Sequence, residues 1–134
     1  MEKIEWDESL SVGIETIDEQ HKMLIKRLHD VSEAIEQNQG EGTIAKTLDF
    51  LVDYTDFHFS EEEKQMTKFN YPGLALQQTQ HKEFKESLER LERDFEEDNA
   101  TKELANHIRT FLFNWLIKHI KEVDLEFGKF VKEN

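Results

Sequence analysis

Apolar residues recur at spacings of three and four along most of the chain, and this pattern constrains the fold more than any other feature. Residues three or four places apart on an α-helix share one face, so each run predicts a helix with one buried side. Polar turn residues and the single proline, Pro72, separate the runs. The predicted helices cover residues 17–37, 43–68, 72–96 and 101–127.

Four helices of roughly 20 residues with short connections predict an all-α fold, an antiparallel up-down-up-down four-helix bundle. The 134 residues fit one domain, residues 1–134. Residues 1–15 show no helical period, so we expect an extended N-terminal arm across the bundle, anchored by Trp6. Residues 16–19, Thr-Ile-Asp-Glu, are typical of a capping box and predict the start of the first helix. Gly128 is the expected end of the last helix.

The chain is strongly acidic, which excludes some classes of binding partner. Because the formal net charge is -13 and phosphate binding needs clustered Lys and Arg, no nucleic-acid partner is expected. The sequence contains no run of about 18 apolar residues, which a membrane-spanning helix would need. The amino terminus does not resemble a signal peptide. The expected location is therefore cytoplasmic. Since the chain has no cysteine, any metal must be held by histidines and carboxylates.

Several polar residues fall inside the apolar runs, where the helices should face the core. His58 and Glu62 are four residues apart, so both project from one face of a helix. An ionised carboxylate on a core face is costly unless it is paired or coordinated. The inward polar residues are His21, His58, Glu62, Gln77, His81, His119 and Asp124.

These residues are predicted to lie at one level along the bundle axis. They come near the start of the first and third helices and near the end of the second and fourth. Four imidazoles and two carboxylates are too many donors for one tetrahedral zinc, and a set without thiolates suits iron or manganese. Two carboxylates able to bridge indicate a two-metal centre. The Glu-x-x-His motifs of ferritin-like di-iron proteins are absent from the sequence.

The spacing between two of these residues predicts an irregular helix. His119 and Asp124 are five residues apart, which on a regular α-helix separates them by about 140°. We therefore predict a π-bulge between them, as often found at functional sites. Two further histidines, His29 and His107, lie two or three turns from this level and are expected at the surface.

Four motifs resemble the hemerythrin family, specifically the single-domain bacterial hemerythrins, over essentially the whole chain. They are residues 4–13 (Ile-Glu-Trp-Asp-Glu-Ser-Leu-Ser-Val-Gly), 17–21 (Ile-Asp-Glu-Gln-His), 58–62 (His-Phe-Ser-Glu-Glu) and 119–124 (His-Ile-Lys-Glu-Val-Asp). The resemblance implies a four-helix bundle with a non-haem di-iron centre, two oxo- or hydroxo-bridged iron ions, that binds O2 reversibly.

The resemblance also implies a role for each inward residue. The implied ligands are His21 and His58 for the iron that binds O2, His81 and His119 for the other iron, and Glu62 and Asp124 as bridges between the two. Trp115 and Leu116 resemble residues that line the O2 pocket of the family, and they also match the apolar stripe of the last helix.

The chain departs from the family at Gln77, where the family has a ligand histidine. The amide oxygen can ligate the iron, it can hydrogen-bond a metal-bound water, or the side chain can point elsewhere and fill space. The second iron would be held less tightly in each case.

Three hypotheses about function follow. The leading one is an O2-binding protein, not an enzyme, that stores, delivers or scavenges O2. The second is a di-iron oxidase or peroxidase whose activity arises from Gln77. The third is a module that senses O2 or handles iron.

Overall fold

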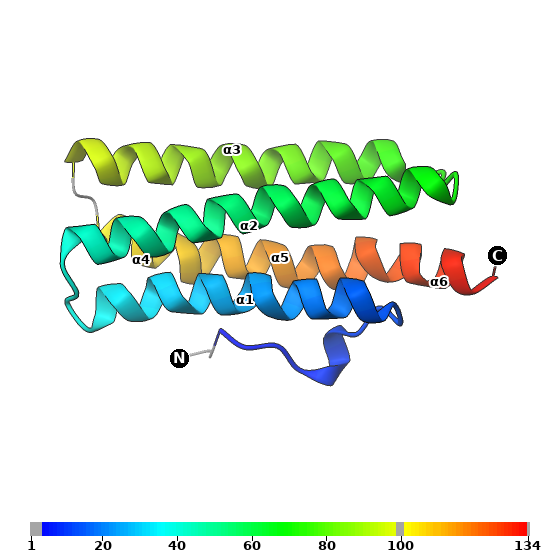
Figure 1. Cartoon of the computed structure of the whole chain (residues 1–134), viewed down its shortest axis with the longest axis horizontal. Coiled ribbons are helices and arrows are strands. Elements are labelled where there is room, and N and C mark those ends of the chain that lie inside the picture. The colour runs from blue at the N-terminus through cyan, green and yellow to red at the C-terminus, as the bar shows by residue number, and fades with distance from the viewer. Residues whose placement is uncertain (1–3, 99–100, 134) are drawn as a thin grey trace.

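Four long antiparallel helices form the computed structural model, which describes residues 4–98 and 101–133 (Figure 1). The first three are α1 (Glu15–Glu36), α2 (Glu41–Lys68) and α3 (Leu74–Asp98). The fourth is continuous but alternates between α- and π-helix: α4 (Thr101–His107), η2 (Ile108–Leu112), α5 (Phe113–His119), η3 (Ile120–Asp124) and α6 (Leu125–Glu133). No strand occurs in the described part of the chain, and the predicted all-α up-down-up-down bundle is confirmed.

The helices close into a bundle because each one contacts two neighbours. Helix α1 packs on α2, α2 packs on α3, and the fourth helix packs on both α1 and α3. Apolar side chains from all four helices fill the centre, as the spacing of three and four requires. No helix within the described residues is long and apolar enough to cross a membrane.

Asparagines end the first two helices. Asn38 and Asn70 adopt positive φ angles of 53° and 54°, a conformation that asparagine tolerates better than most residues. The following amides then donate backward to carbonyls of the last helical turn, Gln39 N to Ala34 O at 3.0 Å and Tyr71 N to Met66 O at 2.9 Å. These Schellman motifs turn the chain toward α2 and α3.

The start of α1 differs from the sequence prediction, because no capping box forms at residues 16–19. The helix begins at Glu15 with Ile14 at the N-cap, and no side chain caps it. Asp18 instead accepts hydrogen bonds from the backbone amide of Val12 at 2.9 Å and from the hydroxyl of Ser11 at 2.5 Å. The carboxylate in the first turn of α1 therefore ties the N-terminal arm to the bundle.

Aliphatic side chains of the arm are buried more deeply in the bundle than Trp6 is. Leu10, at the end of the short 3-10 helix η1 (Glu8–Leu10), and Val12 are each 3% exposed, whereas the predicted anchor Trp6 is only partly buried. Trp6 packs on the edge of the core, with Lys22 Nζ 4.6 Å from its ring centroid.

Gly128 does not end the last helix, which continues to Glu133. Gly128 is buried against the arm, and a Cβ atom built on it would lie 2.0 Å from the carbonyl oxygen of Val12. Glycine is needed here because the backbone of the arm approaches the helix too closely for a side chain. The prediction that Gly128 ends the helix is therefore wrong, and the glycine instead allows the N-terminal arm to pack closely against α6.

Replacing Gly128 with alanine is expected to lower the free energy of unfolding by about 1–3 kcal/mol, because the arm must move away from α6. Chemical denaturation followed by circular dichroism measures the change. Gly42→Ala is the control, since Gly42 lies in α2 and a Cβ atom there would meet nothing within 4 Å. A Gly128→Ala variant as stable as the control would contradict this account of the arm.

Candidate metal centre

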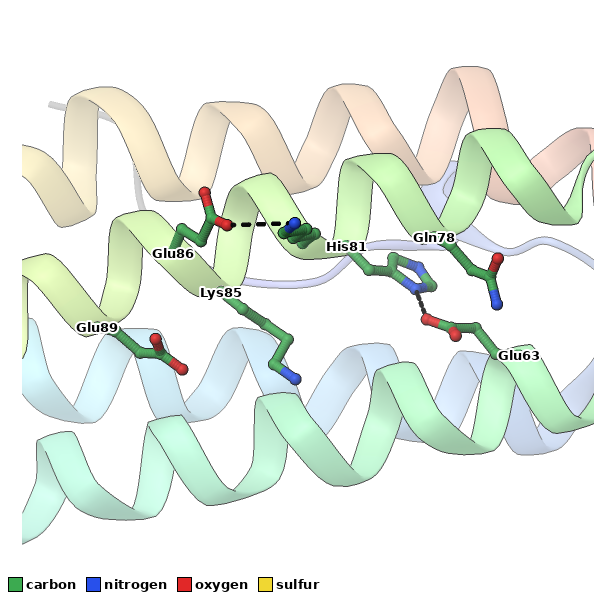
Figure 2. A pocket seen from close by; sticks show the side chains of 7 residues that line it. Glu63, Gln78, His81, Lys85, Glu86 and Glu89 are labelled. Carbon is green, nitrogen blue, oxygen red and sulfur yellow. Dashed lines mark hydrogen bonds and ion pairs between the residues drawn. The ribbon is translucent and has the colours of Figure 1, made fainter.

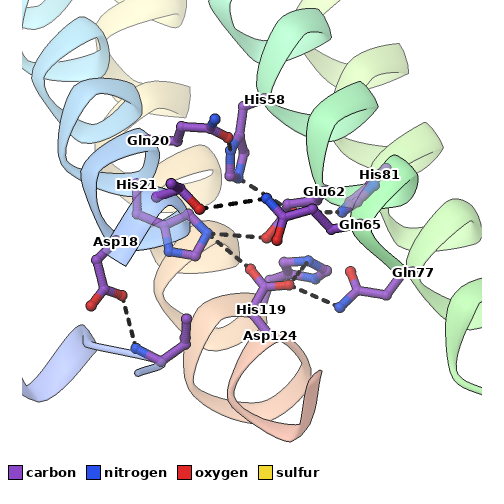
Figure 3. A network of polar contacts seen from close by, with 12 residues as sticks. Asp18, Gln20, His21, His58, Glu62, Gln65, Gln77, His81, His119 and Asp124 are labelled. Carbon is purple, nitrogen blue, oxygen red and sulfur yellow. Dashed lines mark hydrogen bonds and ion pairs between the residues drawn. The ribbon is translucent and has the colours of Figure 1, made fainter. Parts of the chain in front are cut away.

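All seven inward polar residues predicted from the sequence converge at one level of the bundle (Figure 3). Every side chain is buried, with an exposed fraction of 2% or less. Each helix supplies at least one of them, as the antiparallel arrangement requires. They are His21 from α1, His58 and Glu62 from α2, Gln77 and His81 from α3, His119 from α5 and Asp124 from η3.

One half of the cluster is built on His21 and His58. His21 Nε2 lies 3.4 Å from Glu62 Oε2 and 3.1 Å from Asp124 Oδ2. His58 Nε2 lies 3.3 Å from Glu62 Oε1. Two imidazole nitrogens therefore face oxygens of both carboxylates.

The other half is built on His81 and His119. His81 Nε2 lies 3.2 Å from Glu62 Oε1, and His119 Nε2 lies 3.2 Å from Asp124 Oδ1. Each carboxylate thus reaches histidines of both halves. Ligand atoms within 4.8 Å of one another form two groups that share Glu62: one with His21 and His58, the other with His81, His119 and Asp124.

The inward atoms point toward a common space rather than at one another. Although they lie close together, the Nε2 atoms of all four histidines, both oxygens of Glu62 and Oδ2 of Asp124 have no hydrogen-bond partner. Buried polar atoms without partners are costly and uncommon in native proteins. A pair of cations would satisfy them all, so this set of residues fits a two-metal centre of nitrogen and oxygen ligands.

Three of the four histidines are oriented by acceptors on their outer side. An acceptor at Nδ1 keeps the proton on that nitrogen and leaves the lone pair of Nε2 directed inward. The acceptors are Gln20 Oε1 for His58 (2.9 Å), Glu63 Oε2 for His81 (2.7 Å) and Gln80 Oε1 for His119 (2.7 Å).

Sequence reasoning missed all three acceptors. Each lies directly beside a predicted inward residue in the chain: Gln20 precedes His21, Gln80 precedes His81 and Glu63 follows Glu62. That position puts a side chain at the border of the buried face, where it reaches a histidine of a neighbouring helix. Adjacency to an inward residue was therefore the available signal.

The predicted π-bulge between His119 and Asp124 is confirmed, because η3 (Ile120–Asp124) is a π-helix. The wider turn brings two residues five apart onto one face, so both point into the centre. A second π-segment, η2 (Ile108–Leu112), was not predicted. Its inward residues Ile108 and Leu112 are apolar and gave no polar pair from which irregular spacing could be recognised.

Gln77 points into the cluster. Its amide nitrogen donates to Asp124 Oδ1 at 2.8 Å, and its oxygen is buried without a hydrogen-bond partner. The alternative that Gln77 points elsewhere and only fills space is therefore wrong. The free oxygen is an available donor for a cation or an acceptor for a bound water.

Aromatic rings cover the half of the centre that contains His81 and His119. Trp115 stacks on His119 with ring centroids 4.7 Å apart, and Phe59 stacks on His81 at 3.9 Å. Phe59 was missed because consecutive residues on a helix point about 100° apart, which places Phe59 outside the apolar stripe predicted to contain His58. Leu116 is fully buried.

The two remaining histidines do not belong to the cluster. His29 and His107 are exposed and point away from it, as expected.

Mutual attraction between imidazoles and carboxylates shifts their pKa values in opposite directions. Burial lowers the pKa of His21, but the carboxylates of Asp124 and Glu62, which face Nε2 and would accept its proton's hydrogen bond once the ring is protonated, outweigh burial and raise the pKa to about 10. Burial raises the pKa of Glu62, yet the facing histidines hold it well below its ordinary value. The metal-free centre therefore holds protons that a metal must displace.

The fold and the site define a four-helix-bundle protein with a buried cation centre of histidines and carboxylates, and known proteins share this design. The model of the hemerythrin family, described as the Hemerythrin HHE cation binding domain, matches residues 12–131. The chain therefore belongs to the hemerythrin family.

Relatives match along most of their length. Bacteriohemerythrin of Stenotrophomonas maltophilia (strain R551-3) is 30% identical over 127 residues, which cover 95% of this chain and 80% of the relative. Myohemerythrin of Theromyzon tessulatum is 30% identical over 126 residues, covering 94% and 92%. A crystal structure of a hemerythrin with one leucine replaced by alanine has the same fold, with a TM-score of 0.84, 24% identity, and coverage of 97% and 98%.

Metal binding is expected to release protons at neutral pH, because His21 must lose its proton before Nε2 can donate to a metal. Since its pKa is about 10, the apparent affinity should rise about tenfold per pH unit for each proton released, up to that pH. Calorimetry in two buffers with different ionisation enthalpies counts the protons. The same release is expected from a His29→Ala control, whereas an affinity unchanged between about pH 6 and pH 8 would contradict the shifted pKa.

Proposed function

We propose that this protein binds O2 reversibly at a pair of iron ions held between its four helices. One observation carries the proposal: four imidazole nitrogens and two carboxylates, all buried, converge at one level without hydrogen-bond partners for their inward atoms. Relatives of similar length named bacteriohemerythrin and myohemerythrin support it.

The ligand set divides into two positions. His21 and His58 would hold the first iron, His81 and His119 would hold the second, and Glu62 and Asp124 would be shared between them, since each carboxylate reaches histidines of both halves. Nitrogen and oxygen donors without thiolate suit iron. When bound, the iron pair supplies the redox chemistry by which O2 is taken up and given back.

The first position would be the one open to O2. Two imidazoles and oxygens of the two carboxylates would provide four donors there, and a bound iron would supply an open position for a small ligand. The second position has the same number of donors and, in addition, the free oxygen of Gln77. The inward residues thereby direct the small ligand to the His21 side.

The surrounding side chains exclude water from the reaction. Phe59 and Leu116 are buried to 2% or less, and Phe59 and Trp115 stack on His81 and His119. A dry apolar pocket favours O2, which is itself apolar, and limits the access of protons and water that would make oxidation irreversible. Trp115 and Leu116 are the residues of the last helix that the family resemblance proposes for the O2 pocket. Leu116 is buried, whereas the ring of Trp115 stacks on His119, in the half away from the proposed O2 position.

The biological role proposed for this binding is storage, delivery or scavenging of O2 in the cytoplasm. Binding without net chemical change fits a protein that is a carrier and not an enzyme.

Anaerobic reconstitution with ferrous iron tests the proposal. We expect two irons per chain and a visible absorption band that appears under O2 and disappears under argon over repeated cycles. His58→Ala should lose at least one iron and the reversible band, because it removes a ligand of the first position. The matched control is His29→Ala, which removes an exposed histidine and should keep both. Iron that is oxidised once and never returns would exclude reversible binding.

A further inference from the structure

The outer partners of the histidines differ in charge. Gln20 and Gln80 present neutral amide oxygens to His58 and His119, whereas Glu63 presents a carboxylate oxygen to His81 (Figure 3 for Gln20, Figure 2 for Glu63). The distance from His81 Nδ1 to Glu63 Oε2 is 2.7 Å. A carboxylate that accepts a hydrogen bond from Nδ1–H increases the electron density of the imidazole ring. Nε2 then becomes a stronger metal donor than it is when the partner at Nδ1 is a neutral amide.

Glu63 belongs to the border of the bundle and not to its core. Its side chain is 28% exposed and faces a surface groove of about 380 Å³ between α2 and α3 (Figure 2). Two lysines line the same groove, but each lies near another acid, Lys85 near Asp56 at 2.9 Å and Lys82 near Glu86 at 3.9 Å. The carboxylate of Glu63 is therefore directed to His81, and its loss leaves no cavity in the core.

Gln77 weakens the same half of the centre. It donates to Asp124 Oδ1, the oxygen that faces His119 Nε2 at 3.2 Å. A hydrogen bond to a carboxylate oxygen withdraws electron density that the oxygen would otherwise give to a metal. The second position thus has two imidazoles, an oxygen of Glu62, one weakened oxygen of Asp124 and a neutral amide oxygen in place of a third imidazole.

We propose that Glu63 is a positioning residue that sets the strength of the second metal position through His81, and that this position depends on Glu63 because Gln77 supplies no imidazole. The inference rests on the metal pair of the proposed function, but it does not depend on O2 binding. The two metals should accordingly bind in two steps of unequal affinity, only one of which responds to Glu63.

Titration with Co(II) under argon tests this directly, with visible absorption reporting the coordination and equilibrium dialysis the stoichiometry. Glu63→Gln should weaken one of the two steps by about 10–100-fold, the usual loss when an outer partner of a metal ligand is removed. The other step should change little. Glu63→Asp, which keeps the negative charge, should restore part of the affinity.

Glu61→Gln is the matched control. Glu61 lies on the same helix, carries the same charge and contacts Lys64 at 3.6 Å on the surface. Each variant removes one negative charge, so any loss of general electrostatic attraction should be small and the same in both. Beyond that common effect, Glu61→Gln should leave both steps unchanged.

A double-mutant cycle tests the dependence on Gln77. Gln77→His supplies a third imidazole at the second position, so the effect of Glu63→Gln should become several-fold smaller in that background. Thermal unfolding of the metal-free proteins shows whether each variant is folded. If Gln77→His does not fold, the comparison of Glu63→Gln with Glu61→Gln still decides the role of Glu63.

Several results would overturn the proposal. Equal weakening of both steps, no change in either, or the same effect of Glu63→Gln with and without the added histidine would each contradict it. A chain that binds one Co(II) overturns the metal pair itself. Two strong Co(II) steps with irreversible oxidation of the iron protein would instead refute the proposed O2 carriage and leave the role of Glu63 intact.

Discussion

The burial of two carboxylates is the constraint on which the rest of this structure depends. Glu62 and Asp124 are 0% and 1% exposed, at the centre of a helix bundle. An ionised carboxylate in such a place costs several kcal/mol unless its oxygens are satisfied. Histidines from all four helices face these oxygens at one level, so the same level fixes the depth at which the helices pack. Family membership and the orphaned inward atoms both indicate that metal ions complete the centre.

Local irregularities of the chain serve this level. The π-helix of η3 turns Asp124 onto the face of His119, and the outer acceptors hold three imidazoles with Nε2 directed inward. The π-helix interrupts regular α-helical hydrogen bonding, and the outer acceptors are polar groups at the border of the core. Both align the side chains that face the centre. At Gln77 an amide, not an imidazole, points into the centre and donates to Asp124. The centre is therefore built from two unlike halves.

Much of this arrangement could be predicted from the sequence because it follows from periodicity. Apolar spacing predicts the helices, and inward polar residues break that spacing at matching depths, as with His58 and Glu62. The five-residue gap before Asp124 even predicts the π-bulge. Features that depend on contact between distant segments could not be predicted: Gly128 is explained only by Val12 of the arm, and Asp18 caps no helix because it binds that arm. The role of Glu63 could not be predicted either, because its carboxylate meets His81 only when α2 and α3 pack side by side.

Diffraction from crystals of the iron-loaded protein, recorded at the iron absorption edge, tests the central claim most directly. This account predicts two anomalous peaks per chain, one beside His21 and His58 and one beside His81 and His119, with both carboxylates between them. A single peak would contradict the two-metal centre. Two peaks elsewhere would show that the buried carboxylates are satisfied without metal and that the bundle is organised around a different interaction.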